Sequence, residues 1–113
     1  WLQKPFRDEQ YSHGFQSYVC LFQPEEINCN NAKTIQEQRN RFMEYLHKKG
    51  ISTRPGTHAV HILSYYKEKY HLSPEDFSKA YIADHCSICF PLYPSLTSNE
   101  LDYISKCILE YNL

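Results

Sequence analysis

The sequence has 113 residues, of which 42% are hydrophobic and 22% are charged, and this composition is typical of a single folded globular domain. Its 12 basic and 13 acidic residues nearly cancel, so we expect neither nucleic acid nor a membrane as a partner. No apolar run approaches the roughly 20 residues that a bilayer span requires.

The cysteine pattern indicates reduced thiols. The chain has five cysteines, an odd number, and Cys20, Cys86 and Cys107 fall inside expected helices or strands, as buried thiols do. We therefore expect a cytoplasmic protein rather than a secreted domain that is held together by disulfides.

The first half of the chain predicts a strand followed by a long helix. Residues 15–22 are rich in aromatic and β-branched residues, and Pro24 ends this strand. A capping box of Thr34 and Glu37 predicts the start of the helix, and Gly50 is expected to end it in a left-handed conformation. Its core-facing stripe at helical spacing comprises Ile35, Phe42 and Leu46.

The second half predicts two further short strands, at 51–54 and 88–90, and three helices. A short helix is expected over 61–70, and Ser73, Pro74 and Asp76 open another. The last helix begins at a capping box of Thr97 and Glu100. We therefore predict the α/β class in its two-layer α+β form, with residues 1–113 as a single domain that packs helices on a short three-stranded sheet.

The segment GISTRPGTHAVH, residues 50–61, is the most promising place for a binding site. Arg54 offers a planar fork that matches phosphate or carboxylate, and His58 and His61 can donate hydrogen bonds or carry protons. The alternative is that Arg54 forms a surface ion pair while the two histidines cap and pack the start of a helix.

Metal and nucleotide sites are less favoured by the pattern. A structural zinc site needs four ligands, whereas the pairs His58–His61 and Cys86–Cys89 are far apart in sequence, and the cysteine pair lies where a helix passes into a strand. The chain has only 3 glycines and no glycine-rich phosphate loop. We expect no metal.

At GISTRPGTHAVH the chain resembles the DegT/DnrJ/StrS family of sugar aminotransferases, and the likeness continues in the family's order. WLQKP resembles the linker strand that enters the family's small domain, and HGFQSYVCLF resembles the first strand of that domain, with the usual histidine, His13, before it. QRNRFMEYLHKKGI resembles a helix of the family that ends in Gly-Ile, and FPLYP resembles the motif that precedes the last helix. Two departures stand out: Asn40 follows Arg39 where the family often has aspartate, and Phe90 replaces a leucine.

The resemblance implies the C-terminal small domain of a larger enzyme of the aspartate-aminotransferase type (fold type I). Such an enzyme binds pyridoxal phosphate through a lysine of its large domain. We therefore expect no catalytic residue in this chain, no cofactor bound to it and no activity of the chain alone. The alternative is an autonomous, non-catalytic binding module that reuses the fold.

The resemblance also implies a substrate and partners. The parent would move an amino group from a donor to a nucleotide-linked keto-sugar, in the biosynthesis of amino sugars for surface polysaccharides or antibiotics. Its partners would be the sugar nucleotide, the amino donor, its own large domain and a second copy in a homodimer. Thr53, Arg54, His58 and His61 would face the sugar nucleotide.

Overall fold

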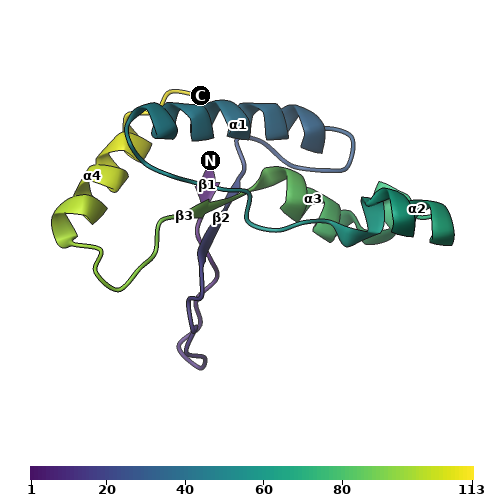
Figure 1. Ribbon diagram of the computed structural model, residues 1–113, viewed down its shortest axis with the longest axis horizontal. Helices are drawn as coiled ribbons and strands as arrows, with labels where there is room; N and C mark the ends of the chain where they lie inside the picture. Colours follow the sequence, from purple (N-terminus) through teal and green to yellow (C-terminus); the bar gives the residue numbers. More distant parts are fainter.

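The computed structural model describes residues 1–113 and has an α+β architecture with two layers. Three strands, β1 (Leu2–Gln3), β2 (Tyr18–Phe22) and β3 (Ser87–Phe90), form an antiparallel sheet in the order β1-β2-β3. The connection between β1 and β2 extends away from the body of the domain (Figure 1). The predicted fold class, with helices on a short three-stranded sheet, is confirmed.

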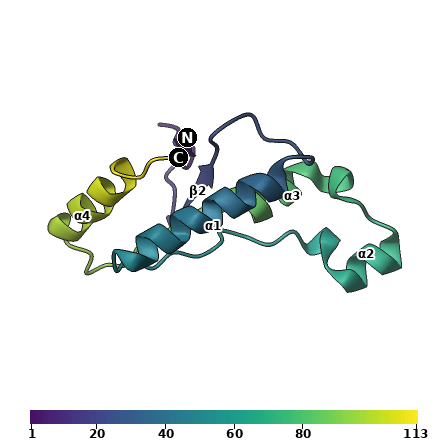
Figure 2. The ribbon, with the colours of Figure 1, turned by 90° about the horizontal axis from the view of Figure 1, so that it is seen from above.

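The helices lie along one side of this sheet and at its two ends. Helix α1 (Ala32–Lys48) crosses the sheet, while α2 (Ser64–Tyr70) and α3 (Ser78–Cys86) lie toward one end and α4 (Ser98–Leu109) toward the other (Figures 1 and 2). Two short 3-10 helices, η1 (Val60–Ile62) and η2 (Pro74–Phe77), precede α2 and α3. None of these helices is long and apolar enough to cross a membrane.

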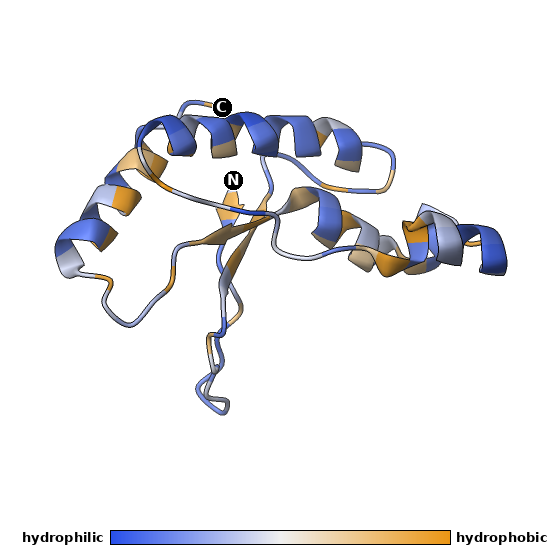
Figure 3. Cartoon of the chain, viewed as in Figure 1, coloured by the Kyte–Doolittle hydropathy of each residue, from blue (hydrophilic) through white to orange (hydrophobic).

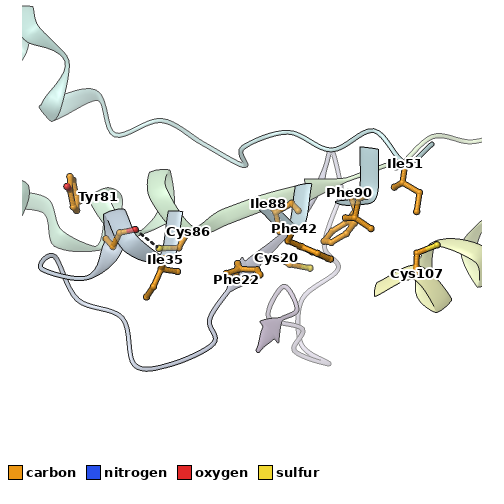
Figure 4. Close-up of a cluster of buried hydrophobic side chains, with 12 residues drawn as sticks. Cys20, Phe22, Ile35, Phe42, Ile51, Tyr81, Cys86, Ile88, Phe90 and Cys107 are labelled. Atoms are coloured by element: carbon orange, nitrogen blue, oxygen red, sulfur yellow. Dashed lines mark hydrogen bonds between the residues drawn. The ribbon is translucent and has the colours of Figure 1, made fainter. Parts of the chain in front are cut away.

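The core lies between α1 and the sheet. The apolar stripe predicted for α1 is fully buried, and Figure 4 shows Phe42, Ile88 and Phe90 gathered in this layer. The outer side of α1 is hydrophilic, whereas the strands are largely hydrophobic (Figure 3). Burying one face of an amphipathic helix against a sheet is the main favourable term in such a fold.

Helix α1 begins two residues before the predicted capping box, so the assignment of Thr34 and Glu37 to its start is wrong. Asn28 and Asn31 instead form the turn that enters the helix: Asn31 Oδ1 accepts from the Asn28 N–H at 2.8 Å. Ala32 then enters the core fully buried, and its carbonyl accepts from the Cys86 thiol at 3.8 Å. Tertiary burial of Ala32 therefore decides where the helix starts.

The helix starts predicted at Thr97 and at Ser73 are confirmed, whereas the helix predicted over 61–70 begins only at Ser64, after η1. The Thr97 N–H donates to Glu100 Oε2 at 2.8 Å, and the Glu100 N–H donates to Thr97 Oγ1 at 3.3 Å, which is the capping box predicted for α4. The Ser73 N–H donates to the Asp76 carboxylate at 2.7 Å, so the predicted start at Ser73 is also confirmed, with η2 preceding α3.

The identity of the third strand differs from the prediction. Residues 51–54 form no strand; Leu2–Gln3 occupies the third place in the sheet, paired with β2. Only Arg54 of the predicted segment pairs at all, in an isolated bridge with Cys89 of β3. Ile51 leaves the strand geometry because its N–H still donates to the Leu46 carbonyl, at 2.9 Å, in the last turn of the preceding helix.

Candidate functional site

The conformation of Gly50 sets the direction of the segment between α1 and η1. Gly50 has a φ of +79°, the left-handed conformation that was predicted to end α1. Its N–H donates to the His47 carbonyl at 2.9 Å, and the next residue, Ile51, is buried. The chain therefore leaves the helix in a defined direction, toward the free edge of β3.

Arg54 is held by its backbone at that edge. Its N–H donates to the Cys89 carbonyl at 3.2 Å, and its carbonyl accepts from the Cys89 N–H at 2.7 Å. The backbone of Ser52, two residues earlier, makes no hydrogen bond to β3. The guanidinium thus extends from a backbone that is anchored to the sheet, while the side chain itself is exposed.

A groove of about 360 Å³ opens beside Arg54, where this segment meets the start of β2 and the chain that follows β3. Its polar side chains come mainly from residues 16–17 and 52–54, and its apolar side chains come mainly from residues 89–93. It is lined by Gln16, Ser17, Ser52, Thr53, Arg54, Cys89, Phe90, Pro91, Leu92 and Tyr93.

The chemistry of this groove favours an anion. None of the four ion pairs in the chain involves Arg54, so its five N–H donors are free for a ligand. Ser17 and Thr53 add hydroxyl groups, and Gln16 adds an amide. A guanidinium surrounded by neutral hydrogen-bonding groups suits phosphate or carboxylate better than a cation.

Tyr93 keeps a neutral phenol at the groove. Desolvation and the neighbouring carboxylate of Glu100 raise the pKa of Tyr93 above its ordinary value of 10.0. The phenol donates to Glu100 Oε1 at 3.4 Å. At neutral pH, Tyr93 is therefore an uncharged phenol whose proton is donated to Glu100, and it adds no negative charge of its own that would repel an anion.

The structure separates the two predicted histidines from this groove. The His58 side chain is 82% exposed, and its Nδ1 lies 3.7 Å from Asp84 Oδ1 on α3. His61 is buried in η1, with its ring centroid 5.2 Å from that of Phe77, and its Nε2 is buried without a hydrogen-bond partner. Of the four residues predicted to contact substrate, Thr53 and Arg54 share the groove, and His58 and His61 line no part of it.

No pattern in the sequence singled out Gln16, Ser17 or Tyr93 as binding residues. Their place in the groove follows from sheet pairing, which brings residues about 40 and 75 positions apart to one edge. Tyr93 lies within the FPLYP segment, and this motif was the only available signal for it.

The thiols of the chain are structural in character. All five cysteines are free, and burial raises the pKa of Cys86 to about 11. A thiolate is the form that binds metal, so such a shift disfavours Cys86 as a ligand. No group of three or more histidine, cysteine, aspartate or glutamate side chains lies close enough together to hold a metal ion.

The sequence profile of the DegT/DnrJ/EryC1/StrS aminotransferase family matches residues 10–109, which is nearly the whole chain. The chain belongs to this family. The resemblance that was inferred from the sequence is therefore confirmed at the level of the family. No curated protein matches the chain closely.

The cofactor expected for a DegT/DnrJ/EryC1/StrS aminotransferase, pyridoxal phosphate, requires a lysine that is enclosed with it. Every lysine of this chain is exposed, and none lines the groove at Arg54. The residues present do not fit a Schiff-base site for the cofactor. What the chain does offer is the groove, whose groups can bind and orient an anionic ligand.

Proposed function

We propose that this chain is the small domain of an aminotransferase that acts on nucleotide-linked keto-sugars, and that the groove at Arg54 binds the diphosphate of the sugar nucleotide. One observation carries the proposal: a guanidinium without a carboxylate partner projects from an anchored backbone into a groove of neutral polar groups. Membership of the aminotransferase family supplies the class of reaction.

In this proposal Arg54 binds the diphosphate, while Thr53, Ser17 and Tyr93 orient the ligand beside it. The substrate contacts predicted for His58 and His61 stay a prediction and form no part of this proposal, because these residues lie by α3 and η2 rather than in the groove. A larger parent protein supplies the lysine that binds pyridoxal phosphate and uses an amino donor. We further propose that the parent is a cytoplasmic homodimer and that the chain alone is inactive.

Titration with inorganic pyrophosphate tests the proposal on the chain itself. Removing charge-assisted hydrogen bonds of about 1.5–3 kcal/mol predicts that Arg54→Ala weakens binding roughly tenfold or more. Arg54→Lys keeps the charge but lacks the planar fork of the guanidinium, so its affinity for pyrophosphate should lie between those of the wild type and Arg54→Ala. Arg41→Ala is the matched control, since Arg41 is exposed on α1 and outside the groove.

Two outcomes would contradict the proposal. The first is an Arg54→Ala chain that binds pyrophosphate as tightly as the wild type. The second is an equal loss for Arg41→Ala, which would show that only net charge matters. In the parent enzyme, Arg54→Ala should raise KM for the sugar nucleotide more than it lowers kcat.

A further inference from the structure

Ser87 stands where three elements meet the segment that carries Arg54. Ser87 is the C-cap residue of α3 and the first residue of β3, and it is buried. Each of its polar groups is bound to a different part of the chain. Its N–H donates to the Ala83 carbonyl of α3, and its carbonyl accepts from Arg39 Nη1 of α1 at 2.8 Å.

The third polar group of Ser87 holds the candidate binding segment. The Gly56 N–H donates to Ser87 Oγ at 3.1 Å. Arg54 pairs with Cys89 in an antiparallel bridge. Gly56, two residues after Arg54, lies opposite Ser87, two residues before Cys89, so the two residues form the next pair in the same register. At this pair a side-chain hydroxyl takes the place of a backbone acceptor, so Ser87 continues the attachment of the segment to β3.

The space around residue 56 admits only a glycine, because the side chains of Val19 and Ser87 lie where a Cβ would be. A Cβ at this position would lie 2.6 Å from Ser87 Oγ and closer still to Val19 Cγ1. The φ of Gly56 lies outside the left-handed range, so any larger residue is opposed by these contacts and not by its own backbone preference. The segment therefore approaches the sheet more closely at Gly56 than a residue with a side chain would allow.

Arg39 holds Ser87 from the opposite side. It lies in the buried stripe of α1 and is 2% exposed. Its bond to the Ser87 carbonyl is the only hydrogen bond that the structure gives this guanidinium, and its Nε is buried without a partner. A buried cation with a single acceptor keeps that acceptor firmly in place, because losing it would leave the charge unpaired.

We infer that Ser87 is a positioning residue for the groove: held by Arg39, it fixes Gly56 and thereby the backbone from which Arg54 reaches an anion. This inference rests on the proposed function for its consequence on binding. The attachment of residues 54–56 to β3, by contrast, does not depend on the proposed function. Ser87 itself does not line the groove and touches no ligand there.

The first test measures the segment without any ligand. Loss of the hydroxyl in Ser87→Ala predicts that the Arg54 and Gly56 amide protons exchange roughly tenfold faster, as one hydrogen bond of local protection is removed. Amides in the middle of α1 should keep their rates. Ser64→Ala, at an exposed serine of α2, is the matched control. Unchanged exchange at Arg54 and Gly56 in Ser87→Ala would overturn the inference.

The second test is a double-mutant cycle on the affinity for inorganic pyrophosphate, with Arg54→Ala and Ser87→Ala alone and combined. If Ser87 acts through Arg54, Ser87→Ala weakens binding about three- to tenfold in the wild-type background and has no further effect once Arg54 is alanine. Equal weakening in both backgrounds would instead assign Ser87 a general structural role and overturn the inference.

The two proposals fail in different ways. If Arg54→Ala leaves the affinity unchanged, the proposed function is wrong, and the exchange rates of Arg54 and Gly56 then decide the positioning role by themselves. If Arg54→Ala weakens binding but Ser87→Ala changes neither affinity nor exchange, the proposed function stands and the positioning role is wrong.

Discussion

Phe42 is the residue whose truncation should destabilise the domain most. It is fully buried in the middle of α1. Its ring centroid lies 4.7 Å from Tyr111, 5.1 Å from Trp1, 5.9 Å from Phe22 and 6.4 Å from Phe90. The ring thus joins α1 to two strands of the sheet and to both ends of the chain.

The expected magnitude follows from this environment. Truncating a buried phenylalanine to alanine costs about 3–5 kcal/mol, including the cavity left behind. Aromatic pairs add about 0.5–1.5 kcal/mol beyond their buried area, which places Phe42→Ala near 4–5 kcal/mol. For a chain of 113 residues each kcal/mol lowers Tm by about 4 °C, so Tm should fall by about 15–20 °C.

Urea unfolding followed by circular dichroism measures this difference. Phe77→Ala is the matched control, because its ring is 54% exposed and its loss should cost less than about 1 kcal/mol. Phe42→Leu should recover about half of the loss by refilling the cavity. A loss below about 2 kcal/mol for Phe42→Ala, with an unchanged m-value, would refute the packing described for α1.

Two further predictions concern titrating groups. Hydrogen bonds from the backbone and the hydroxyl of Thr97 hold the pKa of Glu100 below its ordinary value of 4.5, so the ionised carboxylate stabilises α4 above that pH, and its contribution is lost as the pH falls through the lowered pKa. The Tm difference between wild type and Glu100→Gln should therefore be full at pH 7 and should shrink as the pH falls through the lowered pKa of Glu100. Glu68→Gln, at an exposed residue of α2 with no capping role, is the control. A difference between wild type and Glu100→Gln that persists in acid would contradict the capping role. Burial raises the pKa of Cys20 and of Cys86 to about 11, so iodoacetamide at pH 8 should label the half-buried Cys29 first and reach those two thiols only after unfolding, as read by mass spectrometry. Labelling of Cys86 as fast as Cys29 in the folded chain would show that the thiol is accessible.

Features with a local cause could be predicted from the sequence. The capping box of Thr97 and Glu100 is made by residues three apart, and the left-handed Gly50 follows directly from its position after a helix. The stripe of Ile35, Phe42 and Leu46 is likewise visible in the spacing alone. Such features need no knowledge of the rest of the chain.

Features that depend on residues far away in the sequence could not be predicted in this way. The two residues of β1 have no strand pattern of their own, and only the resemblance of WLQKP to the family's linker strand indicated a strand there. Their pairing with β2 depends on the edge that β2 presents to them. The last helix shows the same limit: Leu101 lies at helical spacing with Ile104 and Ile108, which predicts a place on the core-facing side, yet Leu101 is 49% exposed. The direction of α4 relative to the sheet decides which of its apolar residues enter the core.

The candidate site was half predictable for the same reason. The segment around Arg54 was identified by its Pro-Gly turn and its charge, yet the partners of that segment come from β2 and from the chain after β3. Arg39 could be read only as a helix residue, because its burial against the Ser87 carbonyl depends on β3 lying beneath α1.

The central claim is that the groove at Arg54 receives a sugar nucleotide. Titration of the ¹⁵N-labelled chain with UDP-glucose, and separately with dTDP-glucose, tests it most directly by mapping the amide resonances that move. If the groove binds the sugar nucleotide, we expect saturable shifts concentrated at Ser17, Thr53, Arg54 and Tyr93. Shifts centred on His58 and α3, or no saturable shift with either compound, would contradict it.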